Sequence, residues 1–158
     1  MQGNVTVVQT LRAALPAEAH LNLQYRMDAR LAKFQGYKKI AKKFSRFGDD
    51  THYFLKRVTE QLLFLSGDGG EPTTEYTMPG IAEPPTVPAM FDAALAAERS
   101  ICMAYENAIP VCVAALDDET RNLYEHLVKW HHDIVRWLEK QQRVIAEIGV
   151  TNYLSEKL

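Results

Sequence analysis

Helical periodicity, repeated over most of the chain, is the feature that most constrains how this sequence folds. Apolar residues recur at every third or fourth position through residues 4–35, 38–66, 87–115 and 118–147. That spacing places them on one face of an α-helix. No segment shows the strict apolar–polar alternation of a half-buried strand, so the sequence predicts an all-α protein with four long helices.

The connections between these stretches indicate how the helices are arranged. Gly36 interrupts the first pattern, and the glycine- and proline-rich residues 67–87 form a connection long enough to cross the molecule. Thr86 is positioned to cap the following helix, and a short tail after Gly149 predicts a small C-terminal fifth helix. Short, long and short connections between four helices are typical of a ferritin-like four-helix bundle with one long crossover loop.

Length and composition narrow the class of protein further. The 158 residues suit a single domain over 1–158, and the balance of 47% hydrophobic and 24% charged residues is that of a globular protein. The net charge of −2 argues against nucleic-acid binding, which needs a concentrated basic face. Without an apolar span or a leader-like N-terminus, a cytoplasmic protein with no membrane contact is expected. Cys102 and Cys112 lie ten residues apart on one helix, too far for a disulfide.

Three ionisable residues fall in the middle of the apolar stripes: Glu18, Glu98 and His131. Leaving a carboxylate unpaired in an apolar interior costs several kcal/mol, so these residues need each other, a metal or water. Two carboxylates and an imidazole suit iron, manganese or zinc, which predicts a metal site between helices. The alternative is a buried hydrogen-bonded cluster of the same three residues, closed by Tyr25.

A di-iron bundle would need more ligands than these. Such sites use a Glu from each of two helices and a Glu-x-x-His pair from each of the other two. The positions in register for those pairs hold Thr51 with Phe54 and His131 with Ile134, so neither pair is intact. The Asp49-x-x-His52 sequence has the right spacing but lies off the core stripe.

Several other side chains are expected on the surface. His20 and His126 are predicted to be solvated, and Tyr37, Tyr53 and Tyr124 are predicted to be exposed aromatics that contact neighbouring subunits. The acids that precede the last long helix, Asp117 and Asp118, are expected to favour its N-terminus or to guide cations.

Four segments together make the chain similar to the bacterioferritin family over nearly its whole length. They are "LQYRMDARLAKFQGYKKI" (residues 23–40), "LLFLSG", "WLE" and "IGVTNYL". The resemblance implies a hollow 24-subunit shell that stores ferric mineral, a di-iron ferroxidase centre within each subunit, and haem b shared across a two-fold interface.

Carrying the family's ligand pattern over residue by residue changes this picture. Glu18 and Glu98 match the two single Glu ligands, while Thr51, Phe54 and Ile134 replace ligands with side chains that do not suit iron. The remaining position has His131 in place of Glu. The resemblance therefore implies a ferroxidase centre that is largely lost, with at most one metal at Glu18, Glu98 and His131.

The resemblance also draws attention to the second helix. His52 stands where the family has its methionine haem ligand, and imidazole is a good axial ligand. The alternative is an interface histidine that pairs with Asp49 or Asp50. Asp50 is in addition a candidate lumen acid that offers its carboxylate to mineral.

Taken together, these expectations describe an iron-storage subunit that builds a cage and relies on a second, catalytically intact bacterioferritin subunit to oxidise Fe(II). The cage could be a homo- or hetero-oligomer. Two alternatives remain: a mononuclear iron site at Glu18, Glu98 and His131 that handles oxygen or peroxide, and a structural protein without metal. The sequence favours a chain that is not itself an enzyme.

Overall fold

The computed structural model describes residues 3–67 and 85–158, and in these residues it contains helices and no strand. The all-α prediction is confirmed, and the predicted bounds of the long helices differ from the observed ones by at most one residue. The helices are α1 (Val5–Phe34), α2 (Lys38–Ser66), α3 (Val87–Ala114), α4 (Asp118–Ile148) and α5 (Val150–Ser155).

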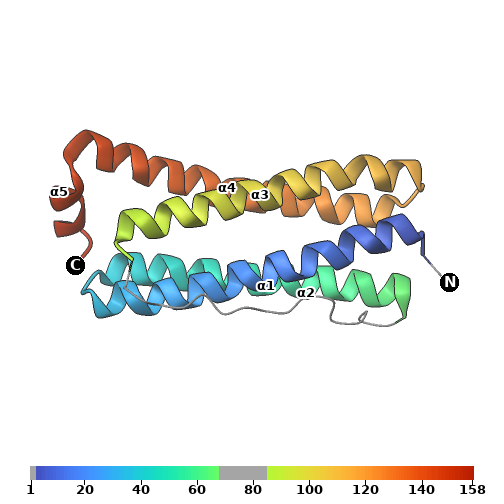
Figure 1. Ribbon diagram of the computed structural model, residues 1–158, viewed down its shortest axis with the longest axis horizontal. Helices are drawn as coiled ribbons and strands as arrows, with labels where there is room; N and C mark the ends of the chain where they lie inside the picture. The colour runs from blue at the N-terminus through green and yellow to red at the C-terminus, as the bar shows by residue number, and fades with distance from the viewer. Residues whose placement is uncertain (1–2, 68–84) are drawn as a thin grey trace.

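The four long helices form two antiparallel hairpins that lie side by side (Figure 1). α1 packs most extensively on α2, and α3 packs most extensively on α4. α2 ends at one end of the bundle and α3 begins at the other, so these two helices run in the same direction (Figure 1). This is the ferritin-like topology with one long crossover. Most of the predicted crossover, residues 68–84, lies outside the described residues.

Side-chain caps and a glycine fix where several helices begin and end. The Thr86 hydroxyl accepts a hydrogen bond from the Ala89 amide at 3.3 Å, as the sequence predicts. Asp117 caps α4 in the same way, through the Thr120 amide at 2.9 Å. α2 ends at Gly67, which has the left-handed φ of 71° that only glycine adopts without strain.

The apolar stripes meet along the bundle axis in a core rich in aromatic rings. Tyr124 belongs to this core: its side chain is fully buried, and its hydroxyl lies 2.7 Å from Thr10 Oγ1. The prediction that Tyr124 is an exposed aromatic is therefore wrong, because its position continues the stripe of Leu127. Tyr53 is 43% exposed, in agreement with the prediction, whereas Tyr37 is half-buried.

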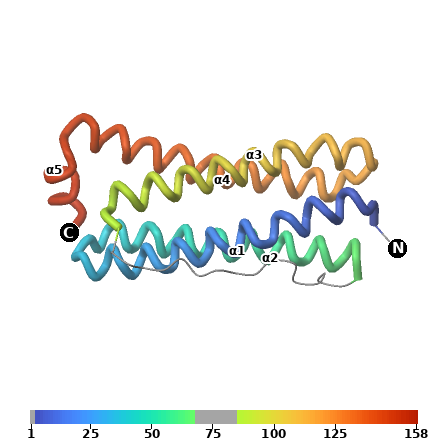
Figure 2. Tube along the Cα trace, in the orientation of Figure 1, coloured from blue at the N-terminus to red at the C-terminus, as the bar shows by residue number. Residues whose placement is uncertain are grey.

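The C-terminal helix α5 turns back across one end of the bundle (Figure 2). Tyr153 anchors it: the ring is fully buried, and its hydroxyl donates to Gln141 Oε1 at 2.8 Å. The Lys39 ammonium donates to the Glu156 carbonyl at 2.7 Å, which joins the tail to the start of α2. The predicted fifth helix is thus a packed part of the fold.

Both cysteines are buried and free, as predicted from their spacing. None of the helices in the described ranges combines the length and the apolar character needed to cross a bilayer.

Candidate metal centre

Glu18 from α1, Glu98 from α3 and His131 from α4 meet at the middle of the bundle, and all three side chains are fully buried. The helical stripes explain this meeting, because each residue occupies a core position on its own helix. The three residues predicted to lie in the interior therefore meet in one buried cluster.

His131 lies between the two carboxylates and contacts both of them. Its Nδ1 is 2.6 Å from Glu98 Oε2, and its Nε2 is 2.8 Å from Glu18 Oε1. Two carboxylates accept hydrogen bonds, so a ring that donates from both nitrogens is the imidazolium form. This is the hydrogen-bonded arrangement that the sequence analysis gave as the alternative to a metal site.

Two tyrosines complete the cluster. The Tyr25 hydroxyl donates to Glu98 Oε1 at 2.6 Å, which is the closing contact expected for this residue. The Tyr105 hydroxyl from α3 donates to Glu18 Oε1, also at 2.6 Å. Burial and the neighbouring carboxylates raise the pKa of both phenols well above the usual value, so both remain protonated donors.

The charge of the cluster follows from its surroundings. Burial by itself would lower the pKa of His131, but the hydrogen bonds and negative charges of Glu18 and Glu98 outweigh it and raise the pKa to about 10. His131 is then a cation at neutral pH, and it balances one of two buried negative charges. A cation is needed here in any case, because isolated buried carboxylates are costly.

The α2 side of the cluster offers no strong ligand. The Phe54 ring packs against the His131 ring, with centroids 4.8 Å apart. The Thr51 hydroxyl is 2.8 Å from the Phe47 carbonyl and donates to it, within its own helix. On α4, Ile134 contributes an apolar side chain that is only 4% exposed. Phe54 and Ile134 thus place apolar side chains where the two Glu-x-x-His pairs would have their histidines, in agreement with the sequence.

One atom of the cluster is left without a partner: Glu18 Oε2 is buried and makes no hydrogen bond. Over residues 3–67 and 85–158, no three His, Cys, Asp or Glu side chains form a group that could hold a metal ion. Both nitrogens of His131 already point at carboxylates, so metal binding by Glu18, Glu98 and His131 requires His131 to lose a proton and turn. The residues present therefore fit a proton better than a metal.

His52, the predicted haem ligand, is exposed on α2. Asp49, its suggested partner, instead forms an ion pair with Arg26 at 2.8 Å. The Arg26 side chain lies close over Gly48, where an added Cβ would meet it at 3.0 Å. An exposed imidazole suits axial ligation, but this polar surface of one chain does not fit the apolar face of a macrocycle.

The acids predicted to guide cations differ in their burial and in the partners that their carboxylates already have. Asp117 uses both carboxylate oxygens at the start of α4, accepting from the Thr120 amide and from its hydroxyl at 2.8 Å. Asp118 is exposed and pairs with Arg121 at 3.3 Å. Asp50 is half-buried, which raises the pKa of its carboxyl. Their proposed role toward iron remains a prediction.

Two buried polar residues were not predicted from the sequence. One is Tyr105, the hydrogen-bond partner of Glu18. Asp28 is fully buried one turn beyond Tyr25, and burial raises the pKa of its carboxyl from 3.8 to about 6, although Gln24 donates to it at 2.9 Å. Continuing the stripe through Leu21 and Tyr25 by three residues would have found it.

Comparisons with known proteins agree with the fold. The model of the ferritin-like domain family matches residues 8–148. The bacterial ferritin of Pseudomonas aeruginosa is 26% identical over 159 residues, with all of both chains covered. The bacterial ferritin of Neisseria meningitidis serogroup B is 29% identical, again over the full length of both. The bacterioferritin of Rhodobacter capsulatus is 28% identical, covering 94% of this chain and 90% of that protein. With a match over most of its length and a four-helix bundle of the same topology, this chain belongs to the ferritin-like domain family.

Proposed function

We propose that this chain is an iron-storage cage subunit in which a proton-held ion cluster replaces the ferroxidase centre. The names of its full-length relatives, bacterial ferritin and bacterioferritin, support storage of iron in an oligomeric shell. The observation that carries the loss of catalysis is the position of His131, with Nδ1 2.6 Å from Glu98 and Nε2 2.8 Å from Glu18. Fe(II) is cargo for this subunit, and an intact partner subunit would oxidise it.

Charge balance supports this proposal. A pair of ferrous ions carries four positive charges and needs several carboxylates that bridge and neutralise them. The cluster offers two carboxylates, Glu18 and Glu98, and the imidazolium of His131 already balances one of them. Phe54 and Ile134 add apolar walls where further ligands would be required.

Competition between a proton and a metal ion for His131 also supports a centre without iron. A metal needs the neutral imidazole, whereas the pKa of His131 is raised to about 10. At pH 7 the neutral ring is therefore the minor form, and displacing the proton weakens metal binding. The protein therefore favours a metal-free centre at neutral pH.

The test is Fe(II) oxidation by the purified, metal-free protein in air. We expect the rate of ferric absorbance to equal that of buffer, because the chain cannot hold two irons. The fourfold variant T51E/F54H/H131E/I134H rebuilds both Glu-x-x-His pairs and should gain stoichiometric oxidation. Adding Glu18→Ala to this variant should abolish the gain. Rapid oxidation by the natural chain that Glu18→Ala removes would refute the proposal.

A second candidate is a mononuclear metal site at Glu18, Glu98 and His131 that acts on oxygen or peroxide. The unpartnered Glu18 Oε2 favours it, because this oxygen has lone pairs free to coordinate a metal ion. Its expected signature is metal affinity that rises about tenfold per pH unit above neutrality, as the ring proton is released. Titration with Zn(II) and Fe(II) at several pH values checks this.

The third candidate, a structural protein without metal, predicts no change in melting temperature with any of these metals, because a ligand that binds only the native state must stabilise it. Thermal melts in the presence and absence of Fe(II) separate this candidate from the second. An intact cage that accumulates mineral when mixed with an active subunit would exclude a purely structural role.

Haem b at a two-fold interface is a separate proposal: the exposed imidazole of His52 supports it, whereas the polar surface around His52 in one chain speaks against it. Two such imidazoles from neighbouring subunits would supply both axial ligands. Titration of the assembled protein with haem should give a low-spin spectrum that His52→Ala removes and His126→Ala does not. A spectrum that is the same in wild type and His52→Ala would exclude this ligand.

A further inference from the structure

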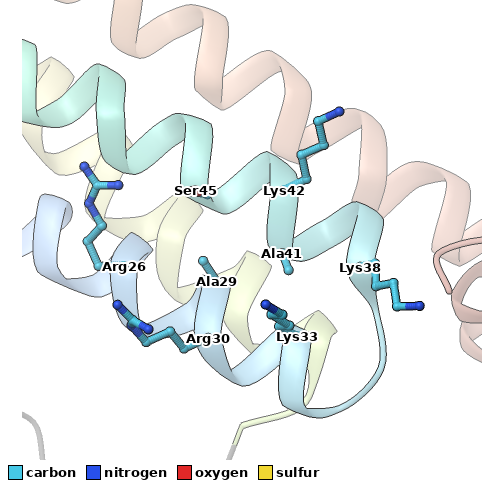
Figure 3. Close-up of a pocket in the computed structure, with 8 residues that line it drawn as sticks. All are labelled: Arg26, Ala29, Arg30, Lys33, Lys38, Ala41, Lys42 and Ser45. Atoms are coloured by element: carbon cyan, nitrogen blue, oxygen red, sulfur yellow. The ribbon is translucent and has the colours of Figure 1, made fainter.

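A basic groove runs between α1 and α2, away from the interior cluster (Figure 3). It has a volume of about 400 Å³. The small side chains of Ala29, Ala41 and Ser45 leave this space between the helices, and long cationic side chains surround it. The cations are Arg26, Arg30 and Lys33 from α1 and Lys38 and Lys42 from α2.

These five cations are largely uncompensated. Within the described part of the chain, Arg26 has an ion pair, with Asp49, and the other four have none. Arg26 and Arg30 are neighbours at i and i+4 on one helix, and Lys38 and Lys42 are neighbours at i and i+4 on the other. Like charges at this spacing repel and weaken a helix. The groove therefore concentrates positive charge at a cost to the fold.

The start of α2 adds to this positive potential. Its first turn contains no acidic residue, and its N-cap residue, Tyr37, makes no side-chain cap. The positive end of a helix dipole favours anions, yet here it carries Lys38 and Lys39. A local conflict of this kind is expected where a site is kept for binding rather than for stability.

We propose that this groove binds an inorganic phosphate chain, of which tripolyphosphate is the simplest probe. Such an anion carries several negative charges in a row, which matches cations spread along two helices, and the arginines can bind its oxygens in pairs. The exposed Ser45 hydroxyl offers a further donor. No aromatic side chain lines the groove, so it has no stacking surface for a nucleotide base.

The side chains can reach such a ligand. Figure 3 shows the Lys33 ammonium over the groove near Ala41, whereas the ammonium groups of Lys38 and Lys42 point outward. Both outward lysines are exposed, and their flexible stems can turn toward an anion.

The experiment is calorimetric titration of the assembled wild-type protein with tripolyphosphate at constant ionic strength, with ATP and chloride as parallel arms. We expect saturable binding of tripolyphosphate, no tighter binding of ATP, and no binding of chloride. The variant R30Q/K33Q should weaken tripolyphosphate binding about tenfold or more, since each lost charge-assisted contact accounts for a large share of the affinity. The variant K129Q/K140Q changes the net charge equally at exposed positions on α4 and should bind like wild type.

Three results would overturn the proposal. The first is heat from tripolyphosphate that does not exceed the chloride arm. The second is equal weakening in both double variants, which would show a general charge effect. The third is loss of assembly in R30Q/K33Q by sedimentation together with no binding by wild type, which would show that a second copy of the chain neutralises these cations. Fe(II) oxidation plays no part in this test, so the outcome is independent of the proposed function.

Discussion

At the scale of single residues, His131 does the work that a metal ion does in a metallated bundle: it brings positive charge between two buried carboxylates. Replacing it leaves Glu18 and Glu98 facing each other without a counter-charge. Removing one partner of a buried ion pair typically costs about 3–5 kcal/mol. The same residue therefore supports the fold and, in the function that we propose, takes the place of the metal ions.

The first prediction concerns stability and pH at His131. Its pKa is raised from 6.5 to about 10 in the folded protein, so its contribution is fully present below pH 6.5 and is lost as the pH rises through about 10. His131→Gln should lower the free energy of unfolding by roughly 3–5 kcal/mol near neutral pH and flatten its decline toward alkaline pH. Urea titrations across this range measure both effects.

The exposed His126 provides the matched control, and His126→Gln should leave the free energy of unfolding and its pH dependence unchanged. If wild type and His131→Gln lose stability in parallel from pH 6.5 to about 10, the ring does not carry the proton assigned to it.

The second prediction concerns Asp28, whose pKa rises from 3.8 to about 6 on burial. A raised carboxyl pKa means that the ionised form destabilises the fold at neutral pH, and that stability is regained as the pH falls through about 6 toward 3.8. Asp28→Asn can keep an oxygen for Gln24, and it should raise the free energy of unfolding by about 1–3 kcal/mol at neutral pH. The gain should vanish near pH 4, and an equal gain at both pH values would contradict this account.

Residue-scale prediction from the sequence succeeded where a polar residue interrupted an apolar stripe, as at Glu18, Glu98 and His131. It failed for Tyr124, because an aromatic residue suits both a core and an interface, and only its place beside Leu127 decides between them. It also could not assign the proton on His131. That assignment needs the two distances to carboxylates on other helices.

At the scale of elements, the short helix α5 is held to the bundle chiefly by Tyr153, which packs on Phe91 with ring centroids 6.2 Å apart. The third prediction follows. Tyr153→Phe should cost about 1 kcal/mol by leaving Gln141 Oε1 without its donor, and Tyr153→Ala about 3–5 kcal/mol through the cavity left behind. Chemical denaturation measures both, and Tyr53→Phe on the exposed face of α2 is the control. Equal stability of Tyr153→Ala and wild type would mean that α5 does not stabilise the bundle.

The bounds of the elements were predictable because their causes are local. Gly36 and Gly67 adopt positive φ at helix ends, and Thr86 caps α3, so the signals that begin and end these helices lie within a few residues. The docking of α5 was not predictable in the same way, since it depends on Gln141 and on the start of α2.

At the scale of the whole molecule, the short, long and short connections made the bundle topology predictable from the sequence. No comparable signal in one chain predicts how subunits assemble. The fourth prediction is that the pure protein forms a closed multi-subunit shell, as expected for a relative of bacterioferritins. Native mass measurement checks this. Co-expression with a subunit that has an intact centre should give mixed shells whose Fe(II) oxidation rate follows the fraction of intact subunits. Shells that sort completely into two pure populations would contradict the proposal that this chain works in one cage with an intact subunit.

The ring contacts around His131 have a practical consequence for spectroscopy. The chain has two tryptophans, and Trp130 stacks on Phe54 with centroids 5.2 Å apart, while Phe54 in turn touches His131. The other, Trp137, lies among Phe47, Phe91 and Lys43. In a Trp137→Phe background, the fluorescence of a single natural indole therefore becomes a label-free sensor of whether the buried imidazole holds or releases its proton.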